Sequence, residues 1–169
     1  AVNGGNWIFF NPTWTFESDG SARLNPGLDP MSTDIRSFLR LTNDAGLNFA
    51  LYPQLNAEVS SDRYWNSTEL TYNWWQRWFT NYQRFVLNYA DFASQHGINT
   101  IIIGGKSVSP AFPNGKLPNG SFSNTPYNFS EQWDGLISEN RSRYSGQVGF
   151  AIPYSDNLDQ LPEFISKVD

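Results

Sequence analysis

The stretch that decides the fold runs from Glu69 to Lys106 and reads ELTYNWWQRWFTNYQRFVLNYADFASQHGINTIIIGGK. Its large apolar residues recur at spacings of three and four, which predicts one face of an amphipathic helix about 25 residues long. These residues are Trp75, Trp78, Phe79, Tyr82, Phe85, Val86, Tyr89 and Ala93. We expect the helix to end at Gly97, because glycine adopts a positive φ without steric cost and can close the last turn.

An apolar run rich in isoleucine, from Ile98 to Ile103, follows this helix. A run without polar alternation is typical of a strand that is buried on both faces, as in a parallel sheet covered by helices. Gly104 and Gly105 end the strand, and Lys106 comes next. In parallel α/β folds the sites lie at the carboxyl ends of the strands. The residues that follow the glycine pair are therefore candidates for function.

The rest of the chain alternates in the same way, and we treat residues 1–169 as a single domain. Further strands are predicted at Asn6–Phe10, Leu47–Tyr52 and Val148–Ile152, and further helices from Pro30 or Ser32 to Gly46, at Glu131–Tyr144 and at Leu158–Val168. This order indicates an α/β fold of right-handed βαβ units with one parallel sheet. Pro12 and Pro53 are expected to end the first two strands. The loops 17–30 and 107–130 are unusually long, and the second either covers a substrate or is poorly ordered.

Composition excludes several classes of function. The 169 residues include 11 basic and 16 acidic ones, for a net charge of −5. The basic residues do not cluster, so we expect no nucleic acid partner. No apolar run reaches the ~18 residues of a transmembrane helix, and no membrane partner is expected. There is no cysteine, the acidic residues are scattered, and the single histidine, His96, falls at a helix end, where a solvated role is favoured by the helix dipole. We therefore predict no metal and no cofactor. Separately, four Asn-x-Ser/Thr sequons are compatible with an extracellular or secreted protein.

Aromatic residues make up 17% of the chain, and the surplus can present flat apolar faces to a ligand. Trp14 and Tyr154 follow predicted strands, and Trp65 lies in the polar loop before the long helix. Gln54 and Asn56 add two amides after the second strand. Together these five side chains predict a cleft that stacks on pyranose rings and bonds their hydroxyls. Local packing is the alternative for each of them: a helix staple for Trp65, contact with its own loop for Trp14, and loop hydrogen bonds for the amides.

A helix of the form WF..Y..F...YA..A...G, followed by an apolar strand and a glycine pair, spans Trp78–Gly105. Together with the segments Asn6–Trp14 and Leu51–Pro53, it resembles the TIM-barrel glycoside hydrolases of clan A, and among them the family 113 β-mannanase type. The resemblance implies about half of a (β/α)8 barrel, its second to fifth strands. It also implies a carbohydrate ligand, a polysaccharide or oligosaccharide such as a β-mannan.

Two departures from that family bear on activity. By the resemblance, Lys106 occupies the position of the general acid/base glutamate, and a lysine is a poor proton donor at neutral pH. Retaining hydrolysis needs two carboxyls ~5 Å apart, and a full barrel needs ~250 residues, so the strand that carries the nucleophile is missing. We therefore expect a glycoside hydrolase-like segment that is inactive alone. The alternative is a non-catalytic carbohydrate-binding pseudoenzyme or a structural fragment. Glu17 and Glu58 could substitute for the acid, although solvated loop charge is the simpler interpretation of both.

Half a barrel leaves two open edges, at the strands Asn6–Phe10 and Val148–Ile152. Long apolar edges favour pairing with another chain. We expect a second copy, as a homodimer, or the missing remainder of the barrel to cover them.

Overall fold

The computed structural model describes residues 4–57, 59–153 and 162–169. Its strands are β1 (Trp7–Phe10), β2 (Thr13–Phe16), β3 (Ala22–Arg23), β4 (Asn48–Leu51), β5 (Gln54–Ala57), β6 (Thr100–Gly104) and β7 (Gln147–Ala151). Its α-helices are α1 (Ser32–Asp44), α2 (Ser61–Ser67), α3 (Tyr72–His96) and α4 (Phe129–Arg143), and two 3-10 helices are η1 (Lys106–Ala111) and η3 (Glu163–Lys167).

The main sheet has the order β1-β4-β6-β7, and all of its neighbours are parallel. This confirms the predicted parallel sheet with its strands in chain order. The predicted ends of the first two strands are only partly right. Each is interrupted at its proline, which has no N–H to donate, and then resumes as β2 or β5. These two strands pair in parallel, and β3 pairs antiparallel with β2, so a second sheet of order β3-β2-β5 lies beyond the first.

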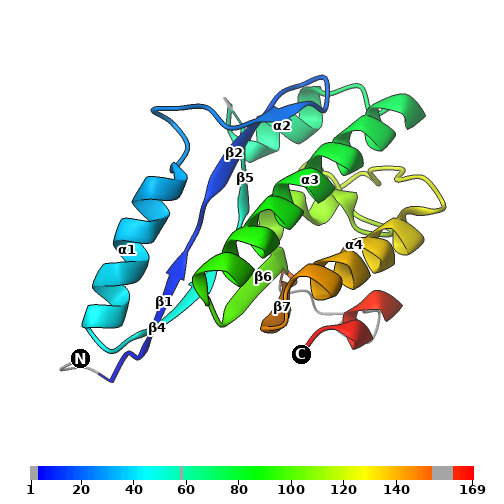
Figure 1. The fold of residues 1–169 in the computed structure, drawn as a ribbon. Helices are drawn as coiled ribbons and strands as arrows, with labels where there is room; N and C mark the ends of the chain where they lie inside the picture. The colour runs from blue at the N-terminus through cyan, green and yellow to red at the C-terminus, as the bar shows by residue number, and fades with distance from the viewer. Residues whose placement is uncertain (1–3, 58, 154–161) are drawn as a thin grey trace.

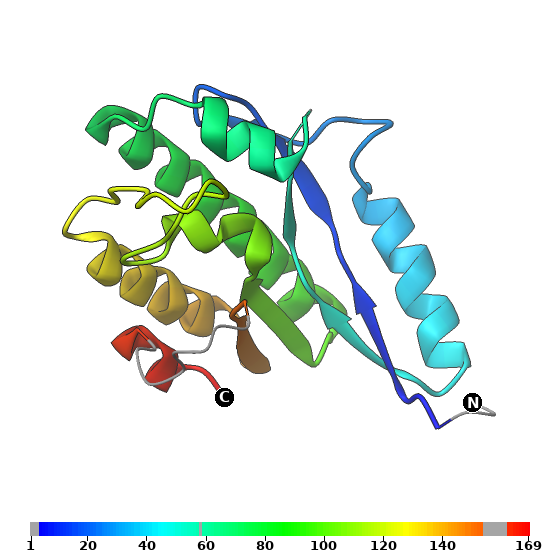
Figure 2. The same ribbon diagram turned by 180° about the vertical axis from the view of Figure 1, so that it is seen from behind.

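Helices cover one face of the main sheet. Figure 1 shows α3 and α4 side by side across that face, with α1 beside β1 and β4. Figure 2 looks onto the opposite face, where the strands are in view and α2 and η1 sit at the upper ends, toward which β6 runs. On β1 the rings of Trp7 and Phe9 are stacked and remain 38% and 56% exposed. An apolar part of the sheet is therefore open to solvent.

The long helix α3 has the predicted length and ends as predicted. It begins after Thr71, whose hydroxyl accepts the N–H of Trp74, and it ends at Gly97, whose φ is 63°. Its apolar face packs against the strands and against rings from α2 and α4, around Trp65, Trp78 and Trp133, all of which are fully buried. This aromatic cluster is the largest part of the core, and it holds α2 and α4 against α3.

Two predictions for the later part of the chain need correction or completion. The helix expected at 158–168 is a 3-10 helix at Glu163–Lys167, and residues 158–161 lie outside the described part. The long loop 107–130 has a defined path, since η1 opens it and Lys116 pairs with Phe122 in an isolated antiparallel bridge. Of the two alternatives for this loop, the structure favours an ordered one.

Candidate functional site

A cavity of about 450 Å³ lies between α2 and η1, where β6 ends. Its position agrees with the rule that parallel sheets bear sites at the carboxyl ends of their strands. The residues that line it are Gln54, Ser61, Asp62, Trp65, Lys106, Ser107, Ser109, Pro110, Lys116 and Pro118. Three of the predicted site residues, Gln54, Trp65 and Lys106, are thus brought together in one wall.

Gly104 and Gly105 turn the backbone from the end of β6 toward η1, which lines this cavity. Gly104 has a φ of 84°, and Gly105 has φ 107° and ψ 176°, a conformation that is essentially restricted to glycine. A Cβ at position 105 would collide with the hydroxyl of Tyr52. Tyr52 follows β4 and is half-buried at this end of the sheet, and its burial raises the pKa of the phenol. The sequence offered no signal for it beyond its place after a strand.

Gln54 and Trp65 are both hydrogen-bonded to Ser107, the residue that follows Lys106 in η1. The Gln54 Oε1 accepts a hydrogen bond from the Ser107 hydroxyl at 3.1 Å, and its Nε2 donates to the Pro53 carbonyl at 2.9 Å. The Trp65 Nε1 donates to the Ser107 carbonyl at 2.9 Å. These bonds fix the path of the backbone beside Lys106. The cavity wall is therefore preorganised around the lysine.

The charges of the cavity are two ammonium groups and one carboxylate. Lys106 and Lys116 are both exposed, and the Lys116 Nζ lies 5.8 Å from the centre of the Phe122 ring, within cation–π range. Asp62, in the first turn of α2, supplies the carboxylate. Across the described residues, none of the ion pairs involves either of these lysines.

Two of the other predicted site residues, Trp14 and Asn56, lie outside the cavity. Trp14 is not a rim residue, because it sits within β2 with its ring 5.6 Å from that of Phe85 and beneath the guanidinium of Arg84. Asn56 lies within β5, and its Nδ2 is 3.5 Å from a carboxylate oxygen of Asp29. Tyr154 falls outside the described residues. Neither Trp14 nor Asn56 is among the side chains that line the cavity.

Trp65 also differs from the expected sugar platform. Its side chain is only 1% exposed, and its ring packs against those of Trp74, Trp75 and Trp78 on α3. The face that a pyranose would need is occupied by protein. The packing alternative is the one that this geometry favours for Trp65.

Asp29, one of the acidic residues whose scatter along the sequence predicted no metal site, is a buried carboxylate. It is 4% exposed and accepts hydrogen bonds from the Thr13 hydroxyl at 2.6 Å, the Asn25 N–H at 2.7 Å, and both the N–H and the hydroxyl of Thr15 at 3.1 Å. A carboxylate with so many donors is satisfied where it stands. Asp29 therefore holds the loop 25–29 against the second sheet.

Of the two substitute acids considered for the cavity, Glu17 is engaged elsewhere. The Glu17 carboxylate forms an ion pair with the Arg23 Nε at 2.7 Å, across the β2–β3 hairpin. Glu58 lies outside the described residues. Asp62 remains as the carboxylate among the described lining residues.

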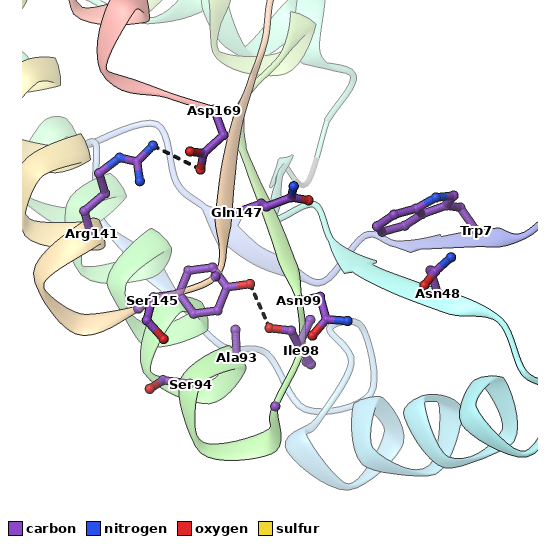
Figure 3. A pocket seen from close by; sticks show the side chains of 13 residues that line it. Trp7, Asn48, Ala93, Ser94, Ile98, Asn99, Arg141, Ser145, Gln147 and Asp169 are labelled. Atoms are coloured by element: carbon purple, nitrogen blue, oxygen red, sulfur yellow. Dashed lines mark hydrogen bonds and ion pairs between the residues drawn. The ribbon is translucent and has the colours of Figure 1, made fainter.

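A second cavity, of about 600 Å³, lies at the opposite end of the main sheet (Figure 3). Two interactions hold groups of its lining: a nitrogen of Arg141 lies 3.0 Å from the Asp169 carboxylate, and the Tyr144 hydroxyl donates to the Ile98 carbonyl at 2.7 Å. Burial, and then the nearby Asp169 carboxylate, raises the pKa of Tyr144 to about 12. The charged groups of this cavity are therefore engaged within the fold.

Within the described ranges no group of three or more His, Asp or Glu side chains is placed to hold a metal ion. In the same residues no helix combines the length and the apolarity that a bilayer crossing requires.

Comparison with known proteins gave matches to one family. The sequence model described as Glycoside Hydrolase Family 113 matches residues 2–114. A solved GH113 β-1,4-mannanase superposes with a TM-score of 0.71 at 15% identity over 97% of this chain. The GH113 β-mannanase AaManA from Alicyclobacillus acidocaldarius, in complex with ManMIm, gives 0.68 at 18% identity over the same share.

A further complex of a GH113 β-1,4-mannanase gives a TM-score of 0.69 at 16% identity. In each of these comparisons the matched region is 49% of the solved chain, so this chain spans about half the length of the structures it resembles. Identities this low establish a shared fold, that of part of a (β/α)8 barrel. No curated protein sequence matches the chain significantly.

Proposed function

The chain belongs to Glycoside Hydrolase Family 113, and we propose that it is a segment of a glycoside hydrolase-like barrel that binds an oligosaccharide or polysaccharide at the cavity beside Lys106. Solved chains with the same fold are β-1,4-mannanases, which makes a β-mannan the first ligand to test. The observation that carries the proposal is the cavity of about 450 Å³ at the carboxyl end of β6. It lies where barrels of this class bind their substrates.

We propose further that Lys106 stands at the position of the family's general acid/base. The support is its place directly after Gly104 and Gly105, at the end of β6 and in the cavity wall. Retaining hydrolysis requires two carboxyls ~5 Å apart, one as acid and one as nucleophile. Among the described lining residues the single carboxyl is that of Asp62. The chain by itself is then expected to bind a glycan without hydrolysing it.

Titration of the protein with β-1,4-linked mannotetraose, followed by calorimetry or by NMR, tests the binding step. We expect saturable binding that Gln54→Ala weakens about 2- to 10-fold, because the variant loses the amide that orders Ser107 and faces the cavity. Gln95→Ala, an exposed change near the end of α3, is the matched control. Absence of binding to mannotetraose by the unmodified protein would refute a β-mannan as the ligand.

Release of reducing sugar from mannan tests the catalytic step. We expect none from the chain alone. Turnover by the unmodified chain would contradict the role assigned to Lys106 and would place the acid elsewhere. If Lys106→Glu restores no turnover in a complete barrel that contains this segment, the assignment of that position is wrong as well.

A second candidate function is that of a structural part of a larger barrel, and the open face of β1 favours it. Trp7 and Phe9 expose large apolar rings on an edge strand, and such edges pair with further chain. A second copy, or the remaining half of the barrel, would cover them through an interface above ~2,000 Å². Sedimentation tests this idea: a dimer, or a complex with the remaining half, supports it, and a stable 19.2 kDa monomer counts against it.

A further inference from the structure

Lysine is rare in this chain and concentrated at one place. The sequence contains three lysines, Lys106, Lys116 and Lys167, against a net charge of −5. Two of the three line the same cavity, one from the start of η1 and one from the loop that follows it. The third is far along the chain, in η3, where it pairs with the Asp134 carboxylate at 2.5 Å. An acidic protein thus carries a local positive site at the carboxyl end of its sheet.

The two cavity lysines are not used to hold the fold together. In the described residues neither lysine takes part in an ion pair. The ion pairs there are formed by Lys167 and by arginines, most of them on the outer helices or the β2–β3 hairpin. Lys116 is steadied by the Phe122 ring at 5.8 Å, which leaves its ammonium hydrogens free to donate. Asp62 offsets one of the two charges. The described lining therefore has one net positive charge.

A neutral glycan would not make full use of this arrangement. A hydroxyl gives a lysine ammonium an ordinary hydrogen bond, whereas a carboxylate gives a charge-assisted one that is roughly twice as strong. Hydroxyls of Ser107 and Ser109 and the amide of Gln54 stand beside the lysines. Each already donates a hydrogen bond within the protein, and their oxygens keep the capacity to accept from ring hydroxyls. The lining thus combines groups for a sugar ring with groups for an anion.

We infer that the ligand is an acidic saccharide, one whose pyranose carries a carboxylate, and that Lys106 and Lys116 pair with that carboxylate. The inference rests on the proposed carbohydrate-binding function of the same cavity and narrows it to a charged substrate class. A lysine at the end of β6 is then a specificity residue for the anion, which explains why a cation occupies a place where a neutral glycan needs none.

Two oligosaccharides that differ in one group test this directly. β-1,4-linked mannotetraose and β-1,4-linked tetramannuronate share linkage and ring, and only the second carries carboxylates. We expect the acidic oligomer to bind the protein about 4- to 25-fold more tightly at low salt, from two exposed ion pairs of about 2- to 5-fold each. The preference should shrink as NaCl rises from 20 to 300 mM, because salt screens exposed charges.

Charge variants sharpen the test. Lys106→Gln and Lys116→Gln should each weaken tetramannuronate binding about 2- to 5-fold, a larger loss than either change causes for mannotetraose. Asp62→Asn removes the opposing charge and should strengthen binding of the acidic oligomer alone. Arg40→Gln, on the exposed surface of α1, removes one positive charge away from the cavity and should alter neither.

The outcomes separate this inference from the function on which it rests. Equal or tighter binding of mannotetraose overturns the acidic ligand and leaves carbohydrate binding intact. Binding of neither oligomer overturns both. If inorganic sulfate at the same ionic strength displaces tetramannuronate completely, the cavity is a general anion site and the saccharide part of the inference is wrong.

Discussion

The two ends of the main sheet carry cavities of comparable size and opposite character. At the amino-terminal end Arg141 is paired with Asp169, and the Tyr144 hydroxyl is bonded to the backbone (Figure 3). At the carboxyl-terminal end Lys106 and Lys116 line the wall without a carboxylate partner in the described residues. Charged groups that pair with one another stabilise the fold, and charged groups without a partner are available to a ligand. We therefore expect stability and binding to be separated along the strand direction, as in (β/α) barrels generally.

Connection length explains this difference. The turns that return from α1 to β4 and from α3 to β6 are short, and Gly46 and Gly97 close them with positive φ. The connections that leave the strands are long, and one of them contains η1 and the Lys116 bridge. Short turns leave no room for free side chains. Long ones bring distant residues, such as Gln54 and Lys106, to the same wall.

The largest expected effect is at Trp65, which belongs to the core even though it touches the carboxyl-end cavity. Trp65→Ala should lower the free energy of unfolding by about 3–5 kcal/mol, because it removes a fully buried indole. Chemical denaturation measures the change. Trp7→Ala, on the open face of β1, should cost much less. A similar loss for both variants would show that Trp65 is no more buried than Trp7.

Gly105→Ala should cause the next largest loss of stability, and the distortion that it causes should be confined to the carboxyl end of the main sheet. The φ of 107° costs a β-carbon about 1–3 kcal/mol, and the collision with the Tyr52 hydroxyl adds to it. Gly135→Ala is the matched control, since Gly135 lies in α4 with open space around it. Alanine there should stabilise the helix by about 0.5–1 kcal/mol. Two thermal melts that shift in opposite directions are expected.

Tyr144→Phe tests the closed, amino-terminal end. It removes a buried hydrogen bond to the Ile98 carbonyl and leaves that oxygen without its donor, so we expect a loss of about 1–2 kcal/mol in unfolding free energy. Glycan binding should stay the same. Tyr127→Phe, at a ring that is 96% exposed, is the control. A change in glycan affinity on Tyr144→Phe would break the separation of the two ends.

The pH dependence of stability should also report on the amino-terminal end. The Val148 N–H, followed by the Arg141 guanidinium, lowers the pKa of Asp169 below its ordinary value. A depressed pKa in the folded state gives stability that is present above the unfolded pKa, near ~3.9, and is lost as the pH falls through the folded pKa. Asp169→Asn should therefore be less stable than the unmodified protein at pH 6 and equal to it at pH 2. A difference that persists at pH 2 would contradict this assignment.

The smallest effect on stability is expected for Lys106→Gln. The side chain is exposed and has no ion pair in the described residues, so unfolding free energy should change by less than ~0.5 kcal/mol. A loss of more than ~1 kcal/mol would mean that Lys106 supports the fold, and the cavity would then resemble the closed end of the sheet.

Much of the architecture was predictable because it depends on local periodicity. The spacing of Trp78, Tyr82 and Phe85 predicted α3, and Gly97 marked its end. Strict alternation predicted the parallel order β1-β4-β6-β7. The second sheet was missed. Pro12 and Pro53 each interrupt a hydrogen-bonding ladder, and nothing in the local sequence shows that the strand resumes at the residue after the proline.

The candidate site was predictable only in part, for a related reason. Gln54 and Lys106 follow predicted strands, and both are found in one cavity wall. Trp14 also follows a predicted strand, but its ring lies against α3. Trp65, predicted in the loop before the long helix, borders the cavity while its ring packs against α3. A ring after a strand can turn to either face, and position in the sequence does not distinguish the two.

By itself the sequence determined the strands of the main sheet, the helices α1, α3 and α4, their order and the family resemblance, because hydrophobic spacing and glycine placement act over a few residues. Only the tertiary structure decided which aromatic rings are core, that Asp29 is a satisfied buried carboxylate, and that Lys106 and Lys116 line one cavity. Each of these features involves residues that are distant in sequence, or residues of one loop that line the same cavity. Their contacts depend on how helices and loops pack around the sheet, and no local pattern encodes that packing.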